Sequence, residues 1–168
     1  DPFDIHPRDK VPVGHRLAQW ALANNYERNV VPSGPLFEKM DKQQEHIRLH
    51  FRYAGGLRDG GNALKAFKIA GSDRMFYPAQ AKIEGESILV SSPNVPDPVA
   101  VRYAFSDTSQ AALYNKAGLP ASSFRTDTWI EFFNKPLIHA RYLPEDDVFE
   151  IRMEYRQILP HTIYYTRD

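Results

Sequence analysis

This sequence lacks cysteine, net charge and long apolar runs, and each of these three absences excludes a kind of site or partner. The 168 residues contain no cysteine, which rules out disulfide bonds and thiolate metal sites. Lysine and arginine together number 21, as do aspartate and glutamate, so there is no net charge to attract nucleic acid or an anionic membrane surface. No apolar run approaches the length needed to span a bilayer, and no signal peptide is visible. We therefore expect neither a nucleic-acid partner nor a membrane partner.

The residues that are abundant favour a folded, mainly β protein. Apolar residues make up 42% of the chain, which is enough to form a packed core. Nine tyrosines and ten phenylalanines favour strands, while thirteen prolines and nine glycines favour the turns that join them.

The N-terminal part of the chain predicts a loop followed by one helix. Prolines punctuate residues 1–12, and the string "VPVGHRLAQWALANNY" then carries apolar residues at helical spacing. Pro12 suits the first helical turn, and the pair Asn24-Asn25 suits the exit. Val13, Leu17, Trp20, Ala21 and Asn24 stand at helical spacing, with Leu22 on the flank, so the predicted helix has one apolar face. No partner helix for this face is evident in the chain.

The next hundred residues predict an antiparallel β-sandwich over residues 30–127. A breaker-rich connection, "NVVPSGPLFEKM", is followed by strings in which apolar and polar residues alternate. In "IRLHFRY" the apolar face would be Ile47, Leu49, Phe51 and Tyr53. In "VAVRYAF" it would be Val99, Val101, Tyr103 and Phe105. The string "MFYPAQAKIEGESILVSSP" predicts two short strands around Gly85, and such short strands joined by turns are typical of a sandwich.

Residues 128–168 behave as a separate piece. The string "VFEIRMEY" alternates cleanly, with Phe149, Ile151, Met153 and Tyr155 on one face, and predicts a further strand. The last residues, "TIYYTRD", are again rich in strand-forming residues.

The clearest candidate for chemistry is the string Asp4-Ile5-His6. A histidine can take a proton from a serine hydroxyl, and a nearby carboxylate fixes its tautomer and stabilises the imidazolium. The alternative is that Asp4 shapes a turn and His6 is an ordinary surface residue, and three residues alone favour it. Ser33 and Ser72 lie in turns of the β region and lack the context of a nucleophilic serine. If Asp4 and His6 are catalytic, the serine lies outside this chain.

Other residue types point to no further site. The six histidines have no metal-binding spacing with one another or with carboxylates, so we expect no metal. Tyr114, Phe124 and Trp129 could stack on sugar rings or pack the end of the sandwich, and we favour packing.

Several strings of this sequence resemble parts of one protein family, and they occur in the same order as in that family. "DIHPRDKVPVGHRLAQWAL" resembles the end of the catalytic domain of the sialate O-acetylesterase family. "VVPSGPLFEKM", "KAFKIAGSDRMFYPAQAKIEGESILVSSPNVPDPVAVRYAF" and "LYNKAGLPASSFRTD" resemble the β module that follows that domain. The resemblance covers residues 1–127.

The resemblance implies the C-terminal portion of an SGNH-type carbohydrate acetylesterase, with a serine mechanism and no cofactor. Residues 1–29 would end an SGNH-type α/β hydrolase domain, with His6 as the general base and either Asp4 or Asp1 as its orienting acid. The helix would cover a sheet of that hydrolase domain. The N-terminal portion of the domain would therefore be a structural partner of this chain. Residues 30–127 would be the accessory β-sandwich. The substrate would be an O-acetylated glycan such as sialic acid, in a secreted, periplasmic or lysosomal protein.

Two further expectations complete the hypothesis. The string "IYYTRD" resembles the start of a further β domain of the kind appended to hexosaminidases and other glycan enzymes. The chain alone would be inactive, because no convincing nucleophile is present. The rival hypothesis is a non-catalytic β-sandwich module that binds glycan or docks onto the hydrolase domain.

Overall fold

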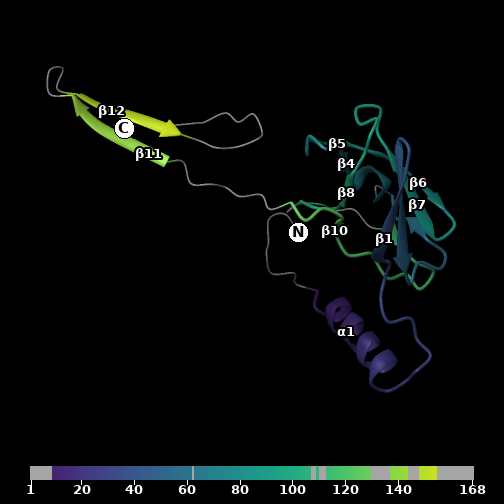
Figure 1. The fold of residues 1–168 in the computed structure, drawn as a ribbon. Helices are drawn as coiled ribbons and strands as arrows, with labels where there is room; N and C mark the ends of the chain where they lie inside the picture. The colour runs from purple at the N-terminus through teal and green to yellow at the C-terminus, as the bar shows by residue number, and fades with distance from the viewer. Residues whose placement is uncertain are drawn as a thin grey trace. The chain divides into compact units, whose positions relative to one another are not determined.

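The computed structural model describes residues 9–61, 63–106, 109, 113–129, 137–143 and 148–154. The chain divides into two compact units, Asp1–Thr128 and Trp129–Asp168. In both units the strands pair antiparallel, and the described residues contain one α-helix (Figure 1). The predicted class, mainly β with a single preceding helix, is confirmed.

Helix α1, Val11–Asn24, forms where the sequence predicts it. A proline lies in its first turn, and the Asn25 amide donates to the Ala21 carbonyl at its end. None of its residues is buried, and Leu17 exposes 67% of its surface. The described helix is too short and too polar to cross a membrane.

The first sheet has four antiparallel strands in the order β1-β2-β7-β6. Their bounds are Leu36–Gln43 for β1, His46–Arg52 for β2, Gln80–Glu84 for β6 and Ser87–Ser91 for β7. Alternate residues of the two central strands point inward and are buried: Ile47, Leu49, Phe51, Ile88 and Val90. Phe51 is 7% exposed, and the other four are fully buried. Burial with a period of two is what one buried sheet face requires.

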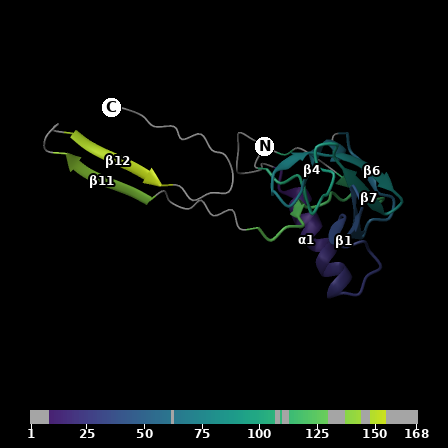
Figure 2. The same ribbon diagram turned by 45° about the horizontal axis from the view of Figure 1, so that its top comes forward.

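The second sheet has the order β10-β8-β4-β5. Its bounds are Phe67–Ala70 for β4, Phe76–Pro78 for β5, Ala100–Tyr103 for β8 and Phe124–Arg125 for β10. A 3₁₀-helix, η1, spans Ala63–Ala66, and the two-residue strands β3, Arg58–Asp59, and β9, Leu113–Tyr114, form a small third sheet. Figure 2 shows β6 and β7 side by side, with β4 in the other four-stranded sheet.

The core lies between the two four-stranded sheets. Phe124 of the second sheet stacks on Phe37 of the first with ring centroids 4.8 Å apart, and meets Phe51 edge-on at 5.6 Å. Phe67 and Tyr103 extend this aromatic cluster from the second sheet. One continuous apolar cluster joins both sheets, so the predicted antiparallel sandwich is confirmed.

The second unit contains one described hairpin. Strand β11, Leu137–Leu143, pairs antiparallel with β12, Val148–Glu154, with Leu137 opposite Glu154 and Leu143 opposite Val148. The strand predicted from "VFEIRMEY" is therefore present as β12. The string "TIYYTRD" lies outside the described residues.

Three sequence expectations within the sandwich are wrong in detail. Strand β1 begins inside the stretch predicted as a connection, because this edge strand is mostly exposed and carries an irregularity between Phe37 and Lys39 that hides its alternation. Tyr53 does not continue the face of β2, since its φ of 58° turns the chain out of the strand. Ala104, with φ 47°, likewise ends β8, so that Phe105 is 47% exposed.

Candidate functional site

The residues singled out for catalysis, His6 with Asp4 or Asp1, lie outside the described residues. The structure therefore places none of them and does not test the predicted pairing. Within the described part of the chain, no group of three histidine, aspartate or glutamate side chains could hold a metal ion.

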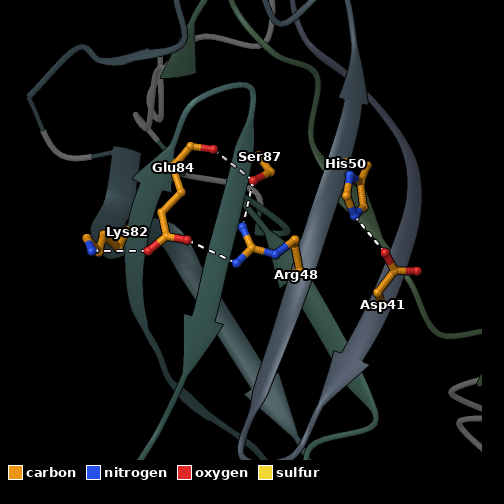
Figure 3. Close-up of polar contacts among 6 residues, drawn as sticks. All are labelled: Asp41, Arg48, His50, Lys82, Glu84 and Ser87. Atoms are coloured by element: carbon orange, nitrogen blue, oxygen red, sulfur yellow. Dashed lines mark hydrogen bonds and ion pairs between the residues drawn. The ribbon is translucent and has the colours of Figure 1, made fainter.

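A polar network covers the outer face of the first sheet (Figure 3). Arg48 of β2 donates to Glu84 of β6 at 3.0 Å and to the Ser87 hydroxyl of β7 at 2.9 Å. Lys82 donates to the other carboxylate oxygen of Glu84 at 3.1 Å. The Lys82 ammonium and the Arg48 guanidinium hold the pKa of Glu84 below its ordinary value. The network therefore joins three strands through one carboxylate and two cationic side chains.

The same face brings together the residue types of a serine-hydrolase triad. His50 Nε2 lies 2.8 Å from Asp41 Oδ2, and Ser87 is the cross-strand partner of His50. However, the Ser87 hydroxyl donates to the Glu84 carbonyl at 2.8 Å. Figure 3 shows the His50 ring directed at Asp41 on β1, away from Ser87. Because the Ser87 hydroxyl donates to a carbonyl and the His50 ring faces Asp41, the three residues are not arranged as a catalytic triad.

A second candidate is a cluster of three loops, residues 32–35, 53–56 and 115–120, which we call the Asn115 loop cluster. The Asn115 side chain is 1% exposed. Its amide nitrogen donates to the carbonyls of Ser33 at 2.9 Å and Tyr53 at 3.0 Å. Its amide oxygen accepts from the Leu119 backbone at 3.1 Å. One buried side chain thus fixes all three loops.

Glycines allow the loops of this cluster to approach closely. Gly56 has a φ of 67°, and a Cβ there would lie 2.8 Å from the Lys116 Cβ. A Cβ on Gly34 would overlap the Pro120 carbonyl. The Lys116 amide donates to the Gly55 carbonyl at 2.7 Å. Positions 34 and 56 need glycine because a Cβ at either would clash with a neighbouring loop. Position 56 also needs it because its φ is positive.

A groove with a volume of about 480 Å³ runs along the Asn115 loop cluster. Tyr53, Gly56 and Lys116 line it together with residues 30–32. The ring of Trp20, from α1, meets the Tyr53 ring edge-on with centroids 6.2 Å apart. This groove combines an aromatic ring, apolar side chains and one ammonium group.

A smaller cavity of about 210 Å³ lies beside β8, with Lys65, Lys68, Arg102 and Phe105 in its lining. Arg102 donates to both carboxylate oxygens of Asp127, at 2.9 and 3.0 Å, and its guanidinium lies 4.1 Å from the centroid of the Phe76 ring. The Asp127 side chain is 1% exposed. This bidentate pair anchors the chain just after β10.

Sequence reasoning missed the residues of the groove. It selected Tyr114, Phe124 and Trp129 as the aromatics that could meet sugar, and correctly favoured packing for Phe124, which lies in the aromatic cluster. Tyr53 was expected on the core face of β2. The available signals were the glycines after Tyr53 and the turn string "NKAGLP", which places Lys116 beside Asn115.

Comparison with known proteins gives an informative likeness among solved structures. No protein-family model matches the chain. No curated protein matches it either. Among solved structures, it is similar to XAC1771, a carbohydrate acetylesterase from Xanthomonas citri, with 43% identity and a TM-score of 0.70. The match covers 75% of this chain and 30% of that one. This β-rich chain therefore spans less than a third of a carbohydrate acetylesterase to which it is similar.

Proposed function

We propose that this chain is the C-terminal part of a carbohydrate O-acetylesterase. The observation that carries the proposal is the 43% identity to a carbohydrate acetylesterase over 75% of the chain, with a TM-score of 0.70. Agreement of both sequence and backbone over that length supports more than a shared fold, which alone would not imply a shared function.

The proposed reaction removes an O-acetyl group from a glycan, with sialic acid as the first candidate sugar. A serine outside this chain attacks the acetyl carbonyl, and His6 takes the hydroxyl proton and returns it to the departing sugar oxygen. Water then attacks the acetyl-serine ester, which releases acetate and restores the serine. Asp4 or Asp1 orients the His6 imidazole. The string "DIHPRD" resembles the end of the catalytic domain of the sialate O-acetylesterase family, and this resemblance supports the role given to His6.

The exposed apolar surface supports a structural partner for α1. Of the large hydrophobic side chains that are exposed among the described residues, all but Phe105 and Tyr142 lie between Val11 and Val31. A contiguous exposed apolar surface marks an interaction site in a soluble protein. We infer that the hydrolase portion covers the exposed side chains of Val11, Val13 and Leu17 on this surface. By the same resemblance we expect a secreted, periplasmic or lysosomal protein.

The test uses the protein as its gene encodes it. Release of acetate is measured from O-acetylated sialic acid, acetylated xylan and an aryl acetate. We expect turnover to fall by roughly 10³-fold or more in His6→Ala, because the serine then lacks its base. Asp4→Asn and Asp1→Asn identify the orienting acid, since only one of them should lower turnover strongly. His15→Ala is the matched control, because His15 is exposed on α1.

Three results would contradict the proposal. Full acetate release by the His6→Ala protein would remove His6 from the mechanism. Hydrolysis by the 168-residue chain alone that depends on His6 would show that the nucleophile lies within it. Absence of esterase activity from the gene-encoded protein on all three substrates would favour the rival function, a binding or docking module.

A further inference from the structure

We propose that the groove along the Asn115 loop cluster binds a pyranose ring that carries a carboxylate, as sialic acid does. The choice of a carbohydrate as the ligand class rests on the proposed function. The shape of the groove, the Tyr53 ring and the nearby charges support the site, and no part of the proposed catalytic reaction uses them.

The groove offers one aromatic ring, that of Tyr53, on which a sugar can pack. The faces of a pyranose ring carry C–H groups, which pack on an aromatic ring and leave the hydroxyls for polar partners. Tyr53 lines the groove and is only partly buried, and Trp20, which is 39% exposed, adjoins the Tyr53 ring. Val30, Val31 and Pro32 extend the apolar lining.

The charges of the groove favour an acidic sugar over a neutral one. Lys116 contributes the only charged side chain of the lining, and no ion pair among the described residues engages it. The exposed Arg52 guanidinium lies 5.8 Å from the centroid of the Tyr53 ring. The Glu86 carboxylate lies near Gly55 but outside this lining, where it can accept hydrogen bonds from sugar hydroxyls. An ammonium without an acidic partner matches a ligand carboxylate.

The groove is built before any ligand arrives. Its floor is held by the three hydrogen bonds of the buried Asn115 side chain. Tyr53 keeps a left-handed backbone, φ 58°, which is costly for a bulky residue and persists where its surroundings impose it. The volume of about 480 Å³ falls in the range of small-molecule sites, about 300–1,000 Å³. Preorganisation of this kind lowers the entropy lost on binding.

The experiment titrates the 168-residue chain with sialyllactose and, separately, with lactose. Isothermal calorimetry measures affinity, and amide NMR shifts locate the site. We expect sialyllactose to bind in the millimolar range and to shift the amides of residues 53–56 and 115–117. Loss of the ion pair in Lys116→Ala should weaken binding by about tenfold. The dissociation constant of lactose from the parent chain should be at least as high as that of sialyllactose from the Lys116→Ala variant.

Two variants separate the aromatic contribution from folding. Tyr53→Asn removes the ring and keeps a residue that tolerates positive φ, so the loop should remain folded while affinity falls. Tyr53→Phe keeps the ring and should bind as the parent chain does. Lys39→Ala removes an exposed lysine on β1 and is the control for net charge.

The outcomes decide the proposal independently of the esterase. Equal affinities for lactose and sialyllactose, or unchanged affinity in both Lys116→Ala and Tyr53→Asn, would overturn it. Binding by this chain that disappears in the gene-encoded protein would also overturn it, because the groove would then be a docking surface for the remainder of that protein. Binding that survives in a protein without esterase activity would uphold the groove and refute the proposed reaction.

Discussion

At the scale of single residues, Asn115 is the most consequential side chain in the described structure. It has two amide protons and a carbonyl oxygen, and the three loops that it joins use all of these groups. A buried polar group with three hydrogen bonds of this kind specifies one arrangement of the loops, whereas one without partners would be costly in a buried position.

Replacement of Asn115 by alanine should therefore destabilise the sandwich unit. The change leaves the Ser33 and Tyr53 carbonyls and the Leu119 amide without a side-chain partner in a buried site. We expect the free energy of unfolding to fall by about 3 kcal/mol, since each unsatisfied buried group costs about 1–3 kcal/mol. Urea unfolding measures the change. Asn29→Ala, at an exposed position, should be within about 0.5 kcal/mol of the parent. Equal stabilities of the two variants would show that Asn115 does not hold the loops.

At the scale of elements, the two-residue pairing of β8 with β10 is too short to hold the edge of the sheet by itself. Phe124 and Arg125 pair with Tyr103 and Arg102. The Arg102–Asp127 ion pair adds two charge-assisted hydrogen bonds immediately after β10, with the Arg102 side chain 11% exposed and Asp127 1% exposed.

Removal of one partner from this ion pair should lower the free energy of unfolding substantially. In Asp127→Ala the Arg102 guanidinium stays largely buried without its carboxylate, and we expect a loss of about 3 kcal/mol in urea unfolding. The matched control is Asp97→Ala, which breaks the exposed ion pair with Lys42 and should cost less than about 1 kcal/mol. A similar small loss in both variants would mean that burial does not strengthen the pair at Asp127.

Elements with a clean period were predictable from the sequence, and elements shaped by tertiary contacts were not. The alternation in β2 predicted the buried faces of Ile47 and Leu49, and helical spacing together with Pro12 predicted α1. Strand β1 was missed because its pairing with β2, not its own pattern, makes it a strand. The groove was missed because Asn115 meets Ser33 and Tyr53 across long stretches of sequence, which no local pattern encodes. The proposed catalytic loop lies outside the described residues, so its prediction stands untested.

At the scale of the whole molecule, the apolar cluster of the described residues lies within the first unit. Its buried members lie between Ile47 and Leu113, and its partly buried members between Phe37 and Phe124. The first unit ends at Thr128. A unit that holds its own core should fold without the residues that follow it.

A chain that ends at Thr128 should therefore keep the fold and stability of the sandwich unit. Its amide NMR peaks for β1 to β10 should superimpose on those of the 168-residue chain, and its urea midpoint should be unchanged. The binding of sialyllactose should also persist, because every residue that lines the groove precedes Thr128.

The control is a chain that ends at Ser122, which removes β10 and with it the stacking of Phe124 on Phe37. That chain should unfold at lower urea concentration, because it loses the aromatic ring that joins the two sheets. Loss of cooperative unfolding on truncation at Thr128 would instead show that residues 129–168 complete the core.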